Sequence, residues 1–442
     1  MLDAATAKTH LAPLLAGAET GFESVDLSGK SLGEDAAPVA AEALASAMRS
    51  GRVRVLSLAD IIAGRPEDEA LRVLRTVTNT IANEDKAMGA LEELDLSDNA
   101  LGAKGVTACG ALLENARNLA RLTLCNNGLA ADAIDNVTRA LTANATATTK
   151  LKTLHFFNNL MESAGARALV PLLRASPALE DFRFSSLRVA RDGGEAIAAA
   201  LAECPELQRV DLSDNTLGER AAMLLADAIR AGKLPKLVSL NMRDTAISDA
   251  GALALLRALA AARHSAITTL DVSGNELTAR VCSALGSASR ALPALRELRA
   301  EENEFGARGG RILAARLAAN SGPRQLRELT VASCEIGGPD AVAEWLKLAE
   351  AAPALQKLNL NGNAFPEDTL DELRRAFGDI LGSLSDNDED LFDEDADDED
   401  DDDVEEEEEE EEDKDDLERS ALNEDEDAGL AELMKGAAVS TT

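Results

Sequence analysis

Aliphatic residues recur along this chain in the spacing L-x-x-L-x-L, which is often followed by x-x-N. The pattern starts twelve times, at Phe22, Val53, Leu91, Leu119, Leu151, Leu179, Leu207, Leu237, Ile267, Leu295, Leu326 and Leu355. Successive starts differ by 28 to 38 residues. Each alternating segment predicts a short β-strand with one buried face. The longest interval, between Val53 and Leu91, predicts a longer helix or loop around residues 76–90.

The repeat that begins at Leu91 shows what each unit should form. Its apolar strand positions should point into the core, and they are Leu91, Leu94 and Leu96. Its polar strand positions should face outward, and they are Glu93, Asp95 and Ser97. Helical spacing of apolar residues over 103–114 predicts a helix on the outer side. Units of this kind stack and share one continuous core.

This period is the signature of leucine-rich repeats at the long end of their range. We therefore predict an α/β fold: a right-handed leucine-rich-repeat solenoid, or ribonuclease-inhibitor-like crescent, with a parallel inner sheet and outer helices. Residues 1–21 should form an N-terminal cap and residues 22–384 about twelve repeats. Residues 385–427 should form a disordered acidic tail and residues 428–442 a C-terminal extension.

An asparagine often follows the strand, eight positions after the start of the repeat. A buried asparagine there can hydrogen-bond to backbone groups of adjacent turns that would otherwise lack a partner. We predict a structural asparagine ladder formed by Asn99, Asn127, Asn159, Asn215, Asn275, Asn303 and Asn363. Other residues occupy this position at Lys30, Ile61, Leu187, Thr245 and Cys334, where we expect a locally different turn.

The formal charge of −36 is concentrated toward the C-terminal end. Residues 386–427 hold 30 acidic residues against Lys414 and Arg419. Such a run repels itself and cannot bury enough apolar area to fold. The tail therefore either solvates the protein or attracts a basic partner through its long-range field. The chain has no basic stripe, so we expect no direct binding of nucleic acid.

The residues of a classical enzyme are largely missing. The five cysteines form no C-x-x-C pair, which is typical of reduced thiols in a cytosolic or nuclear protein. His10, His155 and His264 form no metal-spaced pair, and no phosphate-binding loop or nucleophile elbow is present. His155 should face outward on its strand, as a surface residue or a partner contact. We see no secretory signal, and no apolar run is long enough for a membrane span.

Residues 56–71 depart from the other repeats. Here Arg65 stands between Gly64 and Pro66. Proline restricts the preceding residue to extended backbone, and glycine lets the chain turn sharply. We therefore expect Arg65 to be presented on a restrained loop at the sheet edge. It is either an ordinary exposed side chain or a contact for phosphate or carboxylate on another protein.

A second candidate is the sequence CNNG at residues 125–128. Asn127 fills the ladder position. Asn126 lies one residue earlier, where its side chain should point out of the core, either to cap a turn or to contact a partner. It lies about two repeats from Arg65, on the same edge of the solenoid.

Together these features resemble the Ran GTPase-activating proteins, over residues 22–427. The resemblance rests on the repeat length, the acidic tail and three segments: LADIIAGRPEDEAL (58–71), LSDNALG (96–102) and CNNG (125–128). FFNN (156–159) and ALEDFRFSS (178–186) are similar to the plant and green-algal branch. We expect no counterpart of the N-terminal targeting domain of higher-plant members, nor of the extra C-terminal domain of vertebrate members.

The resemblance implies a GTPase activator that binds Ran in its GTP-bound state, stimulates its GTP hydrolysis and so maintains the nucleocytoplasmic Ran gradient. Arg65 and Asn126 match the family's functional arginine and asparagine, and are the expected catalytic residues. The family is understood to order the catalytic glutamine of Ran, with the asparagine nearby, while the arginine supports the interface. Further partner-binding candidates are Asp60, Gly64, Asp98, Asn99 and His155.

The same resemblance implies that the chain is not an enzyme in its own right, because it acts on the active site of its partner. GTP and Mg²⁺ belong to that partner, so no cofactor is expected. We expect a monomer that binds Ran-GTP, also together with a Ran-binding protein, in the cytoplasm or at the nuclear envelope.

Two other classes of protein remain open. One is a non-catalytic scaffold or inhibitor of the ribonuclease-inhibitor type, which is usually richer in cysteine and in exposed tryptophan or tyrosine. The other is an acidic histone-binding protein, which usually has fewer and shorter repeats.

Overall fold

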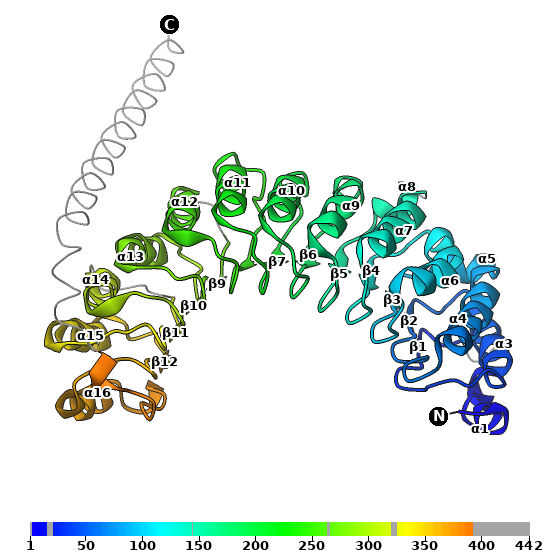
Figure 1. Cartoon of the computed structure of the whole chain (residues 1–442), viewed down its shortest axis with the longest axis horizontal. Helices are drawn as coiled ribbons and strands as arrows, with labels where there is room; N and C mark the ends of the chain where they lie inside the picture. The colour runs from blue at the N-terminus through cyan, green and yellow to red at the C-terminus, as the bar shows by residue number, and fades with distance from the viewer. Residues whose placement is uncertain (1, 16–20, 144, 263–265, 320–324, 392–442) are drawn as a thin grey trace, which may run out of the picture.

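The computed structural model describes residues 2–15, 21–143, 145–262, 266–319 and 325–391. Over these residues the chain forms an open arc, with strands along its inner side and helices along its outer side (Figure 1). The predicted α/β leucine-rich-repeat solenoid is therefore confirmed.

The strands form one parallel sheet in chain order. They are β1 (Ser24–Asp26), β2 (Val55–Ser57), β3 (Glu93–Asp95), β4 (Arg121–Thr123), β5 (Thr153–His155), β6 (Asp181–Arg183), β7 (Arg209–Asp211), β8 (Ser239–Asn241), β9 (Thr269–Asp271), β10 (Glu297–Arg299), β11 (Glu328–Thr330) and β12 (Lys357–Asn359). Each strand begins two residues after the predicted start of its repeat. The spacing of apolar residues thus predicts the position of every strand.

The central residue of each strand points into the core and lies in register with the central residue of the next strand. Leu56 pairs with Leu94, which pairs with Leu122, and all three are buried. Side chains alternate between the two faces of a strand, so the residues on either side of this column face the inner surface. The sheet therefore turns its polar face toward the hollow of the arc.

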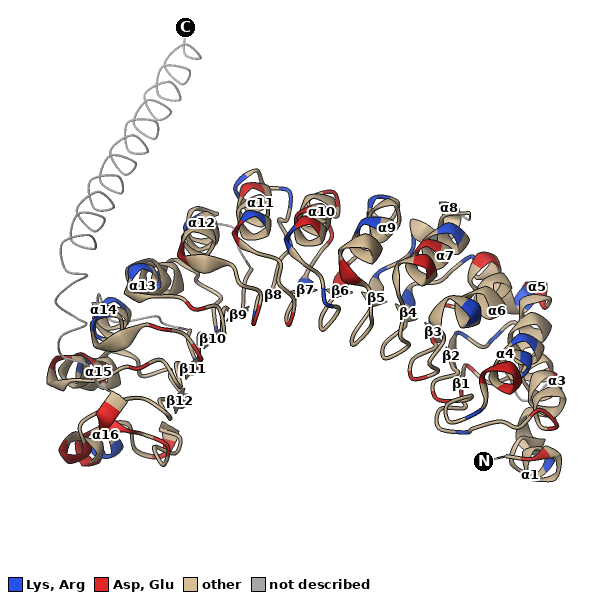
Figure 2. Cartoon of the chain, viewed as in Figure 1, with Lys and Arg blue, Asp and Glu red and all other residues tan. Residues whose placement is uncertain are grey.

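Helices cover the outer side, with one main helix in each repeat. The helices are α1 (Ala4–His10), α2 (Ala12–Leu15), α3 (Ala37–Met48), α4 (Glu67–Ala82), α5 (Asp85–Ala90), α6 (Gly102–Asn115), α7 (Ala131–Thr142), α8 (Ala145–Thr148), α9 (Glu162–Arg174), α10 (Arg191–Leu201), α11 (Glu219–Arg230), α12 (Ser248–Ala261), α13 (Cys282–Ala291), α14 (Gly306–Ala318), α15 (Pro339–Ala351) and α16 (Leu370–Phe377). Positively and negatively charged residues both occur on these outer helices (Figure 2). The long interval after Val53 is filled by the 16 residues of α4 together with α5.

One strand position differs from the expectation. Ser97 was expected to face outward, but only 5% of it is exposed. The chain leaves the strand after Asp95, and the Ser97 hydroxyl accepts a hydrogen bond from the backbone N–H of Cys125 at 3.1 Å. Ser97 therefore helps to join two repeats.

The described N-terminal residues pack on the first repeat. Leu2 forms a parallel bridge with Leu32 and is buried. Ala7 of α1 and Leu11 are buried as well. These residues cover the apolar end of the stack.

At the other end, residues from Leu381 onward contact the last repeat, and these contacts continue past residue 384, where the sequence predicts the repeat domain to end. Leu381 bridges to Leu358 of β12. The Asn387 carboxamide makes two hydrogen bonds with the backbone of Phe365, at 2.8 and 3.0 Å. Residues 381–391 thus form a partial further turn. The rest of the predicted acidic tail and the predicted C-terminal extension lie outside the described residues.

None of the helices in the described part of the chain has the length and apolar character needed to cross a membrane.

Candidate functional site

The asparagines of the predicted ladder are buried and hydrogen-bonded to backbone groups of adjacent turns. The Asn99 carboxamide oxygen accepts from the N–H of Ile61 and Ile62, at 2.9 and 3.3 Å. Its nitrogen donates to three backbone carbonyls, including that of Leu58 at 2.8 Å. Asn99 therefore fixes the start of the loop that leads to Arg65.

The residue before the ladder position has a left-handed backbone conformation in every repeat. These residues are Gly29, Asp60, Asp98, Asn126, Asn158, Ser186, Asp214, Asp244, Gly274, Glu302, Ser333 and Gly362, and we call them the edge row. Asparagine and aspartate tolerate this conformation better than most residues. The edge row follows the carboxyl ends of the strands, so its members line one rim of the sheet.

Asn126 lies in the middle of a short hydrogen-bonded chain within the edge row. Its Nδ2 donates to Asp98 Oδ1 at 2.8 Å, and its Oδ1 accepts from Asn158 Nδ2 at 3.0 Å. All three residues are exposed. The predicted outward direction of the Asn126 side chain agrees with this geometry, whereas its catalytic role stays a prediction.

The Arg65 side chain is not presented outward as the sequence led us to expect. Only 8% of it is exposed, because Nη1 pairs with Glu69 Oε1 at 2.7 Å, one turn along at the start of α4. Nε and Nη2 lie at hydrogen-bonding distance from the Oγ and backbone oxygen of Ser31, at 3.4 and 3.5 Å. The guanidinium therefore packs toward the first repeat, whereas Asn126 lies in the fourth. The structure does not bring these two polar groups together.

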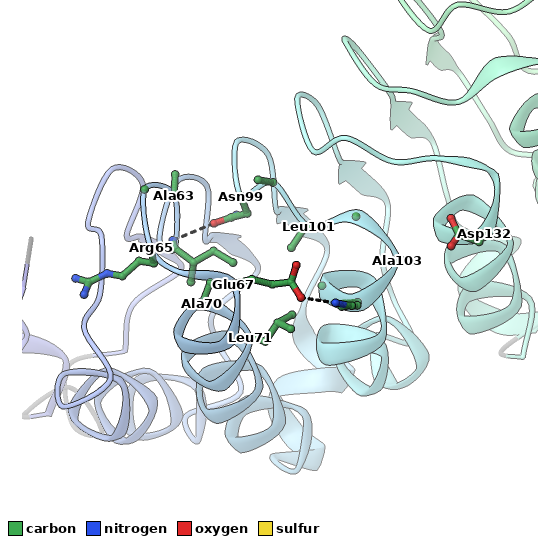
Figure 3. A pocket seen from close by; sticks show the side chains of 15 residues that line it. Ala63, Arg65, Glu67, Ala70, Leu71, Asn99, Leu101, Ala103 and Asp132 are labelled. Carbon is green, nitrogen blue, oxygen red and sulfur yellow. Dashed lines mark hydrogen bonds and ion pairs between the residues drawn. The ribbon is translucent and has the colours of Figure 1, made fainter.

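A cavity of about 500 Å³ lies between the Arg65 loop and the start of α6. Its walls are mixed: Ala70, Leu71 and Leu101 are apolar, whereas Asn99 and Asp132 are polar. Lys104 and Glu67, which also line the cavity, form an ion pair. In Figure 3 the Arg65 side chain points away from this cavity, so the loop contributes backbone rather than charge to it.

The other predicted partner-binding residues occupy different environments. Gly64 is exposed, and its φ of 76° is one that glycine adopts without strain. Asp60 is half-buried in the edge row, and Asp98 contacts Asn126. The burial of Asn99 argues against the expected contact with a partner. Only 2% of Asn99 is exposed, and both ends of its carboxamide bind the backbone.

His155 lies on the inner face of β5, where its Nε2 contacts Asp181 Oδ1 at 3.0 Å. Burial opposes ionisation of Asp181, but hydrogen bonds and charge from His155 and Arg209 outweigh burial and lower the pKa of that carboxyl. On the same face, Arg183 stacks over the half-exposed ring of Phe157, with 4.1 Å from Cζ to the ring centroid. This face therefore carries paired charges beside the edge row.

The cysteine thiols are shielded. Burial raises the pKa of Cys109, Cys204 and Cys334 to about 12 and that of Cys282 well above its ordinary value. Cys125, beside Asn126, is half-buried, and burial raises its pKa as well. The thiols are therefore poor nucleophiles at neutral pH.

No cluster of three or more His, Cys, Asp or Glu side chains arranged to hold a metal ion occurs within the described residues. The rim presents the exposed Asn126 carboxamide, which lies between the Asp98 carboxylate and the Asn158 carboxamide. Such groups donate and accept hydrogen bonds, so they suit the orientation of polar groups on a bound protein.

Sequence reasoning missed three residues at these positions. Asn158 orients Asn126, while Glu69 and Ser31 hold Arg65. The Asn–Asn doublet of residues 126–127 recurs at 158–159, and this repetition could have indicated Asn158. The spacing of four residues between Arg65 and Glu69 could have indicated their pairing. Nothing local indicates Ser31, which stacking of the repeats brings close.

A match to one protein family agrees with the repeat fold. A family described as "Leucine Rich repeat" matches residues 91–108 and 233–256. A crystal structure of an internalin from Listeria monocytogenes is 15% identical, covers 87% of this chain and 93% of the internalin, and has a TM-score of 0.49.

Two curated relatives are Ran GTPase-activating proteins. RAN GTPase-activating protein 2 of Arabidopsis thaliana is 40% identical over 101 residues, which are 23% of this chain and 17% of the plant protein. Ran GTPase-activating protein 1 of Saccharomyces cerevisiae is 28% identical over 218 residues, which are 47% of this chain and 52% of the yeast protein. The matches thus span about a sixth of the plant protein and half of the yeast protein.

Proposed function

We propose that this chain, a leucine-rich-repeat protein related in sequence to Ran GTPase-activating proteins, binds Ran in its GTP-bound state and stimulates its GTP hydrolysis. The chain would act on the active site of its partner, so that the nucleotide and Mg²⁺ are supplied by Ran. By this activity it would maintain the nucleocytoplasmic Ran gradient from the cytoplasm or the nuclear envelope. It would act as a monomer and would also engage Ran that carries a Ran-binding protein.

The observation that carries this proposal is the exposed carboxamide of Asn126, held at the rim of the sheet by Asp98 and Asn158. GTP hydrolysis needs a water molecule in line with the terminal phosphate, and a glutamine of the GTPase orients that water. A preorganised hydrogen-bonding group that fixes such a glutamine lowers the barrier without supplying charge of its own. The family resemblance implies this role for the asparagine at position 126.

Arg65 fits a supporting role better than direct contact with the phosphates. Its guanidinium is already paired with Glu69 and largely buried. An arginine that neutralises phosphate charge must reach the nucleotide, whereas this one is held against the first repeat. Its ion pair instead fixes the loop of residues 61–66 beside the cavity, and this loop would form part of the surface that Ran contacts.

The test is release of phosphate from Ran·GTP with and without catalytic amounts of the full chain. Acceleration over many turnovers per molecule supports the proposal. A titration of the same chain against Ran·GTP by calorimetry provides the contrasting outcome. Tight binding without acceleration would indicate a non-catalytic leucine-rich-repeat scaffold, and absence of both would refute the proposal.

A further inference from the structure

The chain of hydrogen bonds through Asn126 has a direction that chemistry fixes. A carboxylate only accepts hydrogen bonds, so Asp98 must face the NH₂ group of Asn126. The carbonyl oxygen of Asn126 must then face the other way, toward Asn158, whose NH₂ group donates to it. A carboxamide without such neighbours can turn over and exchange its donor and acceptor. Here the Asp98 carboxylate fixes which end of the Asn126 carboxamide carries the NH₂ group.

The backbone holds these three side chains in line. The N–H of Asp98 donates to the carbonyl of Cys125 at 3.0 Å, and that of Asn126 donates to the carbonyl of Phe157 at 2.7 Å. The N–H of Asn158 donates to the carbonyl of Ser185 at 3.2 Å. All three residues also share the left-handed conformation of the edge row. Each is therefore tied to the following repeat, so the spacing of the side chains is a property of the solenoid.

We propose that Asp98 and Asn158 are positioning residues that hold the Asn126 carboxamide in one orientation for its action on the GTPase. This inference rests on the proposed function. Each end of the Asn126 carboxamide makes one hydrogen bond within the row, and each end has the capacity for a second. The GTPase would therefore find one N–H and one carbonyl lone pair of Asn126 available for hydrogen bonding, each at a fixed position. Such alignment matters because a shift of about 1 Å in a catalytic group can cost about 10²-fold in rate.

The test compares variants that remove the neighbours without straining the backbone. Glycine adopts the left-handed conformation freely, so Asp98→Gly and Asn158→Gly delete the side chains alone. Asp98→Asn keeps an acceptor and tolerates the same backbone. Ser333→Gly makes the matched change in the edge row beside β11, seven strands away from β4. Thermal melts of all four variants should stay close to that of the original chain.

Single-turnover hydrolysis of Ran·GTP is then measured over a range of variant concentrations. Asp98→Gly and Asn158→Gly should lower the saturated rate by about tenfold or more while the half-saturating concentration changes little. Asp98→Asn keeps the shape of the side chain but can donate as well as accept, so it should lower the saturated rate, though less than Asp98→Gly does, whereas Ser333→Gly should keep the full rate. Saturated rates equal to that of the original chain in both glycine variants would overturn the inference. A change confined to the half-saturating concentration would also overturn the inference, because it would show that Asp98 and Asn158 contact the GTPase directly and do not align Asn126.

A second readout needs no GTPase. The NMR signals of the Asn126 side-chain amide, assigned through their loss in Asn126→Gly, should shift in Asp98→Gly and Asn158→Gly but not in Ser333→Gly. Unchanged signals would overturn the inference even if the rates fall. If the original chain fails to accelerate hydrolysis while the signals shift as expected, the carboxamide is held as described and it is the proposed function that fails.

Discussion

Arg65 and Glu69 form an ion pair at the start of α4, with 2.7 Å between Nη1 and Oε1. Only 8% of the arginine side chain and 24% of the glutamate side chain are exposed. The pair is therefore neither a solvated surface contact nor a fully buried one, and its contribution to stability lies between those two cases. It joins the Gly64–Pro66 loop to the helix that follows.

Replacing Arg65 by alanine should cost both stability and activity. The loss of the ion pair leaves Glu69 half-buried without its partner, and we expect the free energy of unfolding to fall by about 1–2 kcal/mol. Denaturant titration measures this change, and phosphate release from Ran·GTP measures the activity. The double variant Arg65→Ala/Glu69→Ala is the control, since it removes the unpaired carboxylate. It should regain stability but not activity. Full activity in the double variant would show that Arg65 has no role in the interface.

The two adjacent asparagines should separate stability from activity. Asn127 Oδ1 accepts from the N–H of Asn99 at 2.9 Å, and its Nδ2 donates to the carbonyl of Leu96 at 3.0 Å. Asn127→Ala leaves the buried N–H of Asn99 without a partner and removes one of the two hydrogen bonds to the Leu96 carbonyl, so it should lower the free energy of unfolding by roughly 1–3 kcal/mol. Asn126→Gly should leave the melting temperature nearly unchanged, because the residue is exposed and its φ is 53°.

Hydrolysis of Ran·GTP should respond in the opposite way, with a large effect of Asn126→Gly and little effect of Asn127→Ala. Removal of one positioning hydrogen bond in a catalytic site typically costs on the order of 10²-fold in rate. We therefore expect Asn126→Gly to lower the saturated rate on Ran·GTP by about that factor and to weaken binding less. Asn127→Ala should keep its rate at temperatures where it is folded. An inactive but fully stable Asn127→Ala, beside an active Asn126→Gly, would mean that the two roles are exchanged.

The local pattern of residues predicts the strands well but predicts the rim only in part. Strand positions follow from the alternation of buried and exposed side chains, and this is why each strand begins at a constant offset from its L-x-x-L-x-L start. The outward direction of Asn126 follows from the same pattern. Contacts between repeats do not follow from this local pattern. Ser31 reaches Arg65 across 34 positions of sequence, and Asn158 reaches Asn126 across 32.

For the same reason, the Gly64–Arg65–Pro66 sequence indicates a restrained loop but not the direction of its arginine. That direction depends on Glu69, which competes with solvent for the guanidinium, and on the first repeat, which closes over it. The sequence of a loop therefore suggests that its charged side chain is exposed to a partner even where packing against other repeats buries that side chain.

Two truncations should distinguish the described end of the chain from the predicted acidic tail. Asp388 donates its backbone N–H to the carbonyl of Asn363 at 2.9 Å, and Glu389 Oε2 accepts from the N–H of Glu367 at 2.9 Å. A chain that ends at Leu391 keeps these contacts and should unfold at the same denaturant concentration as the full chain. A chain that ends at Leu384 loses them, and the free energy of unfolding should fall by about 1–3 kcal/mol.

The chain that ends at Leu391 also tests the role of the acidic residues. Its saturated hydrolysis rate on Ran·GTP should equal that of the full chain. Its association with Ran should be slower than that of the full chain at low salt, and the two association rates should become equal at physiological salt, where charges are screened beyond about 8 Å. A large loss of the saturated rate would show that the predicted tail takes part in activation.

Cys125 provides a chemical probe of the rim. It is the half-buried member of the five cysteines, and it adjoins Asn126. Its pKa lies above the ordinary value of 9.0 because burial disfavours the thiolate, so a maleimide should react slowly at pH 7.5 and faster as the pH rises and thiolate forms. The other four thiols are buried and should react only after unfolding.

A bulky adduct on Cys125 would stand beside the Asn126 carboxamide without disturbing the buried ladder. We therefore expect hydrolysis of Ran·GTP to fall in proportion to labelling, with the melting temperature little changed. Mass spectrometry of the labelled chain identifies the site, and a Cys125→Ser chain should resist both labelling and inactivation. Labelling that begins at Cys109 or Cys204 would contradict the burial that the structure gives them. A fully labelled Cys125 with undiminished hydrolysis would place the contact with the GTPase away from this rim.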